Sequence, residues 1–527
     1  MTRLAGTGAL LRLAARRDRV RLTVWVLVLV GLTYFSGSAM ADAFPTLATV
    51  QSYGRSVASS PALIAMTGPP LGLDTLAGIV VNKVALIGIV GVSLVAVLTV
   101  VRHTRAEEEE GRAETVRAAV VGRHAGSLAA LLLAAVVSLL VGVGTAVALV
   151  GSQVPARSAW LFGAGTTALG LVMAAVALVA AQLFTHARAA AGVGVAVLGV
   201  GYVVRAVGDV RENGLVWLSP IGWVQATHVL GDERWWPLLV PVAATVLLVV
   251  LAVVLTERRD LGSGLVAARP GRPSASPVLA GPLVLSLRLQ RGALVGWSTG
   301  VLLLAASMGS LAGEVADLAK GNPTLERYLR AGGAASLADT FLASMLEIAV
   351  LLAGAFAVQS TLRLRTEETS GRLELLLATG LSRTRWLLGS LAATVLGAAV
   401  LVLAAGFGLG LAHGLVDGDA SEPWRLAALA LGYLPAAATL AALAVLLLGW
   451  LPRAGAVAWA ALTGCFLLGW LGGLLEPPRW VTDLSPYEHV AGVPAEPFRA
   501  GPPLVTALVA VVLVAVGVVG LRRRDLG

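Results

Sequence analysis

The chain has 527 residues, of which 57% are hydrophobic and 13% charged, and its mean hydropathy is +0.84. A soluble domain carries about 25% charged residues, so this composition indicates a membrane protein and leaves no room for a large soluble domain. The formal charge of +9 would suit nucleic acid, but the arginines fall in short clusters between apolar runs, a pattern typical of membrane orientation. We therefore expect a lipid bilayer, and no nucleic acid, as the surroundings of this chain.

Twelve apolar stretches are long enough to cross a bilayer core, which takes about 20 helical residues. In chain order they cover 22–40, 76–101, 126–151, 159–184, 189–206, 236–256, 293–312, 340–361, 386–413, 425–451, 454–475 and 503–521. The sequence thus predicts an all-α polytopic protein with 12 transmembrane helices, located in the plasma membrane. Its single cysteine, Cys465, lies inside one of these stretches, which excludes a disulfide framework.

The charges between the spans predict the orientation. Because the number of predicted spans is even, both termini lie on the same side of the membrane. That side carries 27 Lys and Arg residues and 12 acids, whereas the other side carries 11 and 17. Since basic residues are enriched in cytoplasmic loops, both termini are predicted to be cytoplasmic.

The chain also repeats itself. Residues 105–123 (RAEEEEGRAETVRAAVVGR) and residues 365–383 (RTEETSGRLELLLATGLSR) are identical at 8 of 19 positions, at a constant offset of 260. The sequence RRDLG stands both at 258–262 and at the end of the chain. We therefore predict two six-helix halves in tandem, which have the same orientation because each has an even number of spans. The predicted halves are 1–262 and 286–527, with a cytoplasmic linker at 263–285.

Within each repeated segment an acid precedes an arginine by four residues, Glu108 before Arg112 and Glu368 before Arg372. This order favours an ion pair on one helix face. A glycine stands directly before each arginine, where a chain that leaves the membrane must bend. The leucines at 373 and 375–377, ending at Gly380, predict a short amphipathic helix on the membrane surface. A solvated connector is the alternative, but the repetition favours a docking surface.

The pattern E-E-x-x-G-R-x-E-x-L-L-A-x-G-x-x-R resembles the coupling-helix segment of ABC-2 type exporter permeases. A twelve-span chain that carries it twice resembles, more narrowly, the actinobacterial permeases called exporters of polyketide antibiotics. The resemblance implies that each segment sits in a groove of a separate ATPase subunit. It assigns ATPase coupling to Glu107, Glu108, Gly111, Arg112 and Glu114, and to Glu367, Glu368, Gly371, Arg372, Glu374 and Gly380. The first copy departs from the pattern, with Val120 in place of Gly380.

The sequence predicts that another subunit supplies the energy for transport. The two lysines of the chain, Lys83 and Lys320, are not preceded by the phosphate-binding loop G-x-x-x-x-G-K-[ST]. We therefore predict that the chain is not an enzyme and binds no cofactor itself. The resemblance implies two copies of an ATPase subunit that bind ATP and Mg²⁺. Because the spans hold almost no charge, the predicted substrate is a hydrophobic or amphipathic compound, such as an antibiotic, another drug or a lipid.

An ion-coupled secondary transporter is the main alternative, since such carriers also have twelve spans and parallel repeats. They need ionisable groups within the membrane, and the two clear candidates are Lys83 and Glu347, which would form an intramembrane pair. A membrane enzyme would need acids or histidines with metal-ligand spacing. The four consecutive acids at 107–110 point around a whole helix, so we predict no metal site.

Predictions also follow for the outward segments, for the segments before the last spans and for the N-terminal residues. The outward segments 41–75 and 313–339 are too long for simple turns. The segments before the last span of each half are aromatic and are interpreted as interfacial belts, although the resemblance implies short re-entrant helices there. The leucines and arginines of residues 3–21 predict a helix that lies along the membrane surface. The aromatic residues are Trp217, Trp223, Trp235, Trp236, Trp480, Tyr487 and Phe498.

Overall fold

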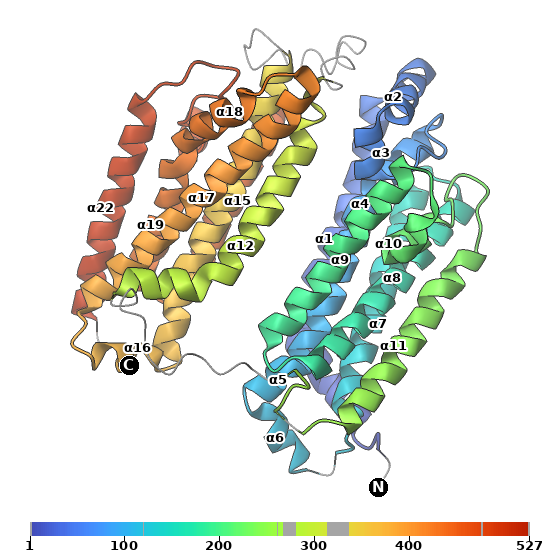
Figure 1. The fold of residues 1–527 in the computed structure, drawn as a ribbon, viewed down its shortest axis with the longest axis horizontal. Coiled ribbons are helices and arrows are strands. Elements are labelled where there is room, and N and C mark those ends of the chain that lie inside the picture. Colours follow the sequence, from blue (N-terminus) through green and yellow to red (C-terminus); the bar gives the residue numbers. More distant parts are fainter. Residues whose placement is uncertain are drawn as a thin grey trace. The chain divides into compact units, whose positions relative to one another are not determined.

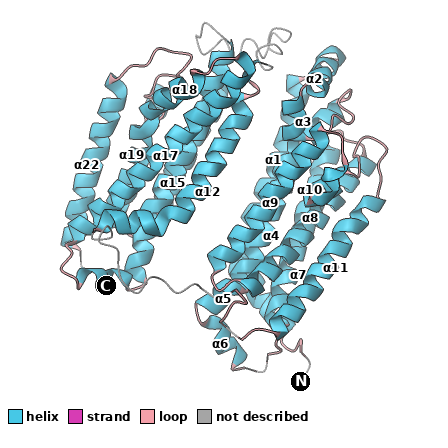
Figure 2. Ribbon diagram, in the orientation of Figure 1, coloured by secondary structure: helices cyan, strands magenta, loops and turns pink. Residues whose placement is uncertain are grey.

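The computed structural model describes residues 3–119, 121–260, 262–266, 281–313, 337–475 and 478–524, and all regular elements in these ranges are helices (Figure 2). The all-α prediction is confirmed for this part of the chain. The chain forms two compact units, Met1–Gly271 and Arg272–Gly527. Residues 267–280 of the predicted linker and residues 314–336 of the predicted outward segment lie outside the described ranges.

The first unit contains long helices joined by short ones (Figure 1). The long helices are α1 (Thr7–Ala43), α4 (Leu76–His103), α7 (Ala125–Gly151), α8 (Ala156–Leu183), α9 (Ala187–Val210) and α11 (Leu239–Glu257). The short ones are α2 (Leu47–Ser59), α3 (Pro61–Thr67), α5 (Arg105–Glu109), α6 (Arg112–Arg117), η1 (Gly214–Leu218), α10 (Pro220–Gln225) and η2 (Trp236–Leu238).

The second unit has a similar composition. Its long helices are α12 (Pro282–Gly309), α15 (Leu337–Thr369), α17 (Arg383–Asp417), α19 (Leu434–Trp450), α20 (Ala456–Leu475) and α22 (Gly501–Arg523). The short helices α18 (Glu422–Ala430) and η4 (Leu431–Tyr433) lead directly into α19, and α16 (Arg372–Leu377) and α21 (Arg479–Thr482) stand alone.

Eleven helices among the described residues are long and apolar enough to cross a membrane, against twelve predicted spans. The predicted span at 454–475 corresponds to α20, whose described apolar part, Ala456–Gly469, is shorter than the others. Several helices, among them α15 and α17, extend beyond the predicted spans because polar residues continue the helix at its ends. The clearest case is α1, where the predicted surface helix and the first span form one helix of 37 residues.

Several helices begin at a residue whose side chain caps them. Thr75 accepts a hydrogen bond from the Gly78 amide at the start of α4, and Ser382 accepts one from the Arg385 amide at the start of α17. Such caps satisfy amides that have no partner within the helix. Thr46 caps α2 in the same way. The predicted outward segment 41–75 is therefore not a loop but holds two ordered helices, α2 and α3.

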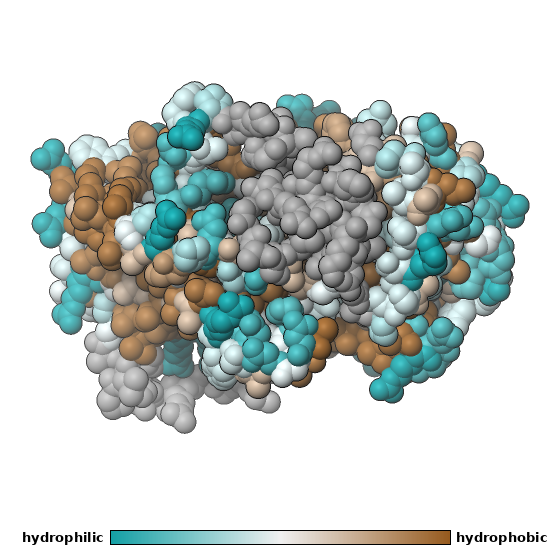
Figure 3. Space-filling model, turned by 90° about the horizontal axis from the view of Figure 1, so that it is seen from above, coloured by the Kyte–Doolittle hydropathy of each residue, from teal (hydrophilic) through white to brown (hydrophobic). Residues whose placement is uncertain are grey.

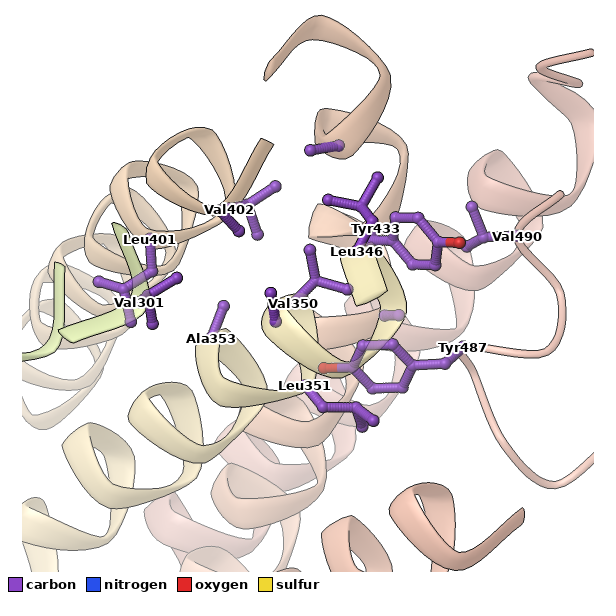
Figure 4. Packing of buried hydrophobic residues seen from close by; sticks show 14 of the residues in the cluster. Val301, Leu346, Val350, Leu351, Ala353, Leu401, Val402, Tyr433, Tyr487 and Val490 are labelled. Carbon is purple, nitrogen blue, oxygen red and sulfur yellow. The ribbon is translucent and has the colours of Figure 1, made fainter. Parts of the chain in front are cut away.

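The core of each unit is built around its second and fourth membrane-crossing helices. These are α4 and α8 in the first unit, and α15 and α19 with its lead-in α18 in the second; each is mostly buried within its own unit. In the second unit, Leu346 and Val350 of α15 pack beside Tyr433 and Tyr487 (Figure 4). Tyr487 is only 1% exposed, so its assignment to an interfacial belt is wrong. Its ring stacks on that of Tyr433 with a centroid distance of 6.4 Å.

The last long helix of each unit, α11 or α22, is by contrast mostly exposed and apolar. The large apolar side chains that they expose include Val246, Leu247 and Val250 on α11, and Leu508, Val511 and Val512 on α22. Such a surface suits contact with lipid. Figure 3 views the end of the units that carries α2 and α18 and shows patches of hydrophilic residues there, with hydrophobic residues beside them.

Candidate functional site

The repeated sequences lie at corresponding places in the two units, and we name residues 105–123 the first charged segment and residues 365–383 the second charged segment. In the first unit the segment holds α5 and α6, at the same end as the N-terminus (Figure 1). In the second unit it begins in the last turns of α15 and contains α16, at the same end as the C-terminus (Figure 1). Each segment follows the second long helix of its unit.

Each charged segment changes direction at a glycine. Gly111 separates α5 from α6 with a φ of +74°, and Gly371 separates α15 from α16 with a φ of +71°. This left-handed conformation costs other residues about 1–2 kcal/mol. The predicted bends at these glycines are therefore confirmed. Gly380, at a φ of +80°, follows the end of α16 as predicted.

The helical ion pairs predicted from the four-residue spacing are wrong. Arg112 does not pair with Glu108 but with Glu107, from Nε to Oε2 at 2.7 Å. Arg372 is exposed and forms no ion pair with Glu368, whose partners lie elsewhere. Since a left-handed glycine ends the helix between the acid and the arginine, the two side chains no longer share one helix face.

The helix α16 has one packed face and one free face. Leu373 is 2% exposed and belongs to an apolar cluster with Trp386 and Leu521 of its own unit. On the other side of the helix Leu375 is 74% exposed, and the neighbouring Glu374 is exposed as well. The predicted amphipathic helix is thus present, and its outer face carries charge together with an apolar side chain.

In the first charged segment the corresponding acid is Glu114 of α6, which is also exposed. Neither Glu114 nor Glu374 forms an ion pair with another described residue. The two acids are aligned by the offset of 260. Both are therefore available to a partner protein. Val120, the counterpart of Gly380, lies outside the described residues.

Glu107 and Glu367 occupy aligned positions but have different partners. Glu107 accepts from Arg112 and also pairs with Arg17 of α1. Glu367 pairs with Arg363 one turn earlier in α15, from Oε1 to Nη2 at 3.0 Å. Glu107 therefore links the first charged segment to α1, whereas Glu367 stabilises the end of its own helix.

Glu108 lies in a group of charges that we call the first arginine–glutamate cluster, with Arg105, Arg123 and Arg259. Both carboxylate oxygens of Glu108 accept from Arg259, at 2.6 and 2.8 Å, and Arg105 approaches to 2.6 Å. Arg123 donates to the main-chain oxygen of Arg259 at 3.2 Å. The side chains of Glu108 and Arg259 are 9% and 5% exposed, so the pair is buried.

Glu368 lies in a similar group of charges, the second arginine–glutamate cluster, with Arg365, Arg383 and Arg524. Both carboxylate oxygens of Glu368 accept from Arg524 at 2.7 Å, and Arg365 approaches to 2.9 Å. Arg383 donates to the main-chain oxygen of Arg524 at 2.9 Å. Three of the four positions are related by the offset of 260, and Arg259 and Arg524 are the second residues of the repeated RRDLG sequences.

Sequence reasoning did not assign Arg259 and Arg524 to the site. They stand 151 and 156 residues after their glutamate partners, so no local spacing indicates the contact. The repeated RRDLG sequence is the signal that could have indicated these two arginines, but it was interpreted only as a sign of duplication. The structure brings both arginines to the charged segments.

The two intramembrane candidates have surroundings within their own units. The Lys83 ammonium lies 4.9 Å from the ring centroid of Tyr53, which comes from α2. Such a cation–π contact holds the charge near an aromatic side chain without an acid. Glu347 of α15 lies close to Gly469 of α20, where a Cβ atom would come within 2.6 Å of its Oε1. The pair between Lys83 and Glu347 joins the two units and stays a prediction.

The structure also shows an ion pair that the sequence analysis did not identify. Arg205 and Asp209 are one turn apart in α9, with Nη1 and Oδ2 separated by 3.1 Å and with side chains 2% and 5% exposed. Arg205 also donates to the main-chain oxygen of Ala65 in the short helix α3, at 2.7 Å. The predicted span 189–206 contains Arg205, but the sequence analysis named only Lys83 and Glu347 as charges within the membrane. The hydrogen bond to Ala65 joins α3 to α9.

A cavity of 130 Å³ opens beside the first charged segment. Leu10 and Leu13 of α1 and Ala130 of α7 form part of its wall, and Glu107 and Arg123 lie at its polar side. Within the described ranges, no group of three or more His, Cys, Asp or Glu side chains could hold a metal ion.

Comparison with known proteins places this architecture among transport proteins. The model of the family described as "Multidrug efflux system permease Rv1217c, C-terminal domain" matches residues 8–255 and 279–522. The multidrug efflux system permease protein Rv1217c of Mycobacterium tuberculosis is 38% identical over 523 residues, which cover 99% of this chain and 95% of that protein. The resemblance to exporter permeases is thereby confirmed.

Proposed function

This chain belongs to the family of the multidrug efflux system permease Rv1217c, and from that membership we propose that it is the membrane-spanning subunit of an ATP-driven exporter. The observation that carries the proposal is the exposed face of each charged segment. Glu114 and Glu374 lie at aligned positions on short helices, directed away from their units and without ionic partners among the described residues. Such faces are suited to binding another protein.

The partner in this proposal is an ATPase subunit, in two copies. The sequence has no phosphate-binding loop, so ATP and Mg²⁺ bind to the partner and not to this chain. One copy docks on each charged segment. A cycle of ATP binding and hydrolysis moves the docked subunits, and the charged segments transmit that movement to the transmembrane helices.

The orientation belongs to the same proposal. The charged segments and both termini are cytoplasmic, which the excess of basic residues on that side supports. The two halves are duplicates with twelve spans in total, α20 being the eleventh. The aligned clusters around Glu108 and Glu368 support this assignment, as does the match of the family model to two separate ranges.

The proposed substrates are hydrophobic or amphipathic compounds. The name of the mycobacterial relative contains multidrug efflux, and the helices of this chain offer few charges to a polar substrate. Of the charges within the long helices, Arg205 and Asp209 neutralise one another, and Lys83 lies against an aromatic ring. Binding in such surroundings depends mainly on apolar area and shape.

The test is to purify the tagged chain from its native membranes in mild detergent and to identify the proteins that accompany it by mass spectrometry. We expect an ATPase subunit at two copies per chain. Glu114→Arg combined with Glu374→Arg should remove it, because reversed charge repels a surface that fits an acid. The matched control, Glu212→Arg with Asp483→Arg, reverses one exposed acid per unit outside the charged segments and should retain the subunit.

The same experiment distinguishes an ATP-driven exporter from an ion-coupled carrier. A chain that purifies alone, and whose transport of ethidium into everted vesicles follows the proton gradient and not ATP, would contradict an ATP-driven exporter. Glu347 would then be the first residue to test, since it is a carboxylate within α15.

A further inference from the structure

Both units repeat one ionic connection between distant parts of the chain. In each, both oxygens of a glutamate in the charged segment accept from an arginine that stands just after the last long helix, Arg259 after α11 and Arg524 after α22. Resting on the proposed function, we infer that Arg259 and Arg524 are positioning residues that couple the ATPase-driven movement of each charged segment to the last helix of its unit.

The geometry is specific. In the first unit Nη1 and Nη2 of Arg259 each donate to one oxygen of Glu108, and such a bidentate pair fixes the direction as well as the distance between its partners. In the second unit Nη2 of Arg524 donates to both oxygens of Glu368. The first pair is buried, the Arg524 side chain is 17% exposed, and in both units further arginines reinforce the pair. Arg105 or Arg365 binds the same carboxylate, and Arg123 or Arg383 binds the main-chain oxygen of the arginine. A movement of the glutamate is therefore transferred to the helix end that carries the arginine.

The two clusters differ in their surroundings, which indicates that the shared part is the ionic connection. In the first unit Arg259 Nε donates to Gln182 of α8 at 2.6 Å. In the second unit Arg524 Nε is buried without a hydrogen-bond partner among the described residues. The glutamate and the three arginines are nevertheless present in both.

The last long helix of each unit packs mainly against one neighbouring helix of the same unit. The main packing partner of α11 within its unit is α8, and that of α22 is α19. Neither α5 nor α6 packs extensively against α11 in the described part of the first unit, so side chains make the link. In the second unit Leu373 of α16 and Leu521 of α22 share an apolar cluster, which strengthens it. Because α11 and α22 are mostly exposed, each is held within its unit chiefly by that one neighbouring helix.

The experiment uses the full chain with its co-purified ATPase, reconstituted in everted vesicles, and ethidium as the transported probe. Arg259→Ala combined with Arg524→Ala should leave the ATPase subunit bound and its ATP hydrolysis close to wild type. Ethidium transport should fall by about tenfold. The matched control, Arg258→Ala with Arg523→Ala, removes the exposed arginine next to each and should transport normally.

A second variant tests whether unfolding causes the loss of transport in the alanine variant. Arg259→Lys with Arg524→Lys keeps the charge but removes the planar guanidinium that reaches both carboxylate oxygens, and it should give intermediate transport per ATP hydrolysed. Transport at the wild-type rate in the alanine variant would overturn the inference. Loss of the ATPase subunit from the alanine variant would overturn it too, because the arginines would then shape the docking surface. Failure of the unmodified complex to bind an ATPase or to transport with ATP would instead count against the proposed function.

Discussion

Arg205 is a charged side chain within the predicted span 189–206 that the sequence analysis did not identify as a charge in the membrane. It is buried in α9, pairs with Asp209, and donates to the main chain of α3. Its guanidinium also lies 4.6 Å from the ring centroid of Tyr202. A buried ion pair contributes modestly to net stability because both charges lose water, but removing one partner leaves the other uncompensated. The arginine therefore matters mainly because Asp209 is beside it.

Arg205→Ala should lower the thermal stability of the purified chain, at a cost of about 3–5 kcal/mol, since Asp209 and the Ala65 oxygen lose their partner. The measurement is thermal unfolding in detergent, followed by loss of the monodisperse peak. Arg205→Met with Asp209→Met, which removes both charges, should recover most of the stability. A double variant as unstable as the single one would show that the charge left on Asp209 is not the cause.

At the scale of elements, the charged segments depend on two glycines more than on their helices. α6 and α16 have six residues each and would not persist alone. Gly111 and Gly371 set the direction in which these helices leave the preceding helix. A Cβ atom at either glycine would meet nothing within 4 Å, so the demand for glycine comes from the backbone conformation and not from crowding.

Gly111→Ala combined with Gly371→Ala should reduce the amount of ATPase subunit that co-purifies, because each alanine costs about 1–2 kcal/mol in the left-handed conformation. The controls are Gly126→Ala in α7 and Gly292→Ala in α12, where a Cβ atom is equally free of neighbours but the backbone is helical. These should leave the amount unchanged. Equal retention by the two alanine pairs would mean that the bends do not shape the docking surface.

For the whole molecule, the distribution of charge makes a prediction about orientation. The side with both termini has an excess of 15 positive charges, and the opposite side has an excess of 6 negative charges, by the predicted spans. This asymmetry favours cytoplasmic termini because positively charged loops are retained inside. This orientation then fixes the side of the membrane on which each long helix begins and ends.

Cysteine labelling in intact cells tests that topology, in a background with the buried Cys465 replaced by Ala. A membrane-impermeant maleimide should label Ser52→Cys and Asp483→Cys directly. It should label Thr115→Cys and Ser370→Cys, in the two charged segments, only after the membrane is permeabilised. All four positions are exposed in the structure, so access to the reagent reports the side of the membrane. The reverse pattern would contradict cytoplasmic docking.

The membrane class, the approximate spans and the bends at Gly111 and Gly371 followed from the amino-acid sequence alone. Each depends on local properties: a bilayer requires a continuous apolar stretch, and a left-handed turn requires a residue without a Cβ atom. The charged segments were also found in this way, because their repetition is visible without a structure. The predicted pairs of Glu108 and Glu368 failed because local spacing was applied across a glycine that ends the helix.

Only the tertiary structure decided which charges meet. Glu108 binds Arg259 and Glu368 binds Arg524 across more than 150 residues, because the packing of each unit brings the end of the last helix beside the charged segment. The burial of Tyr487 and the hydrogen bond from Arg205 to the Ala65 main chain depend in the same way on segments that are far apart along the chain. Hydropathy determines that a helix crosses the membrane, whereas its neighbours are chosen by the summed packing of many side chains, which no short segment contains.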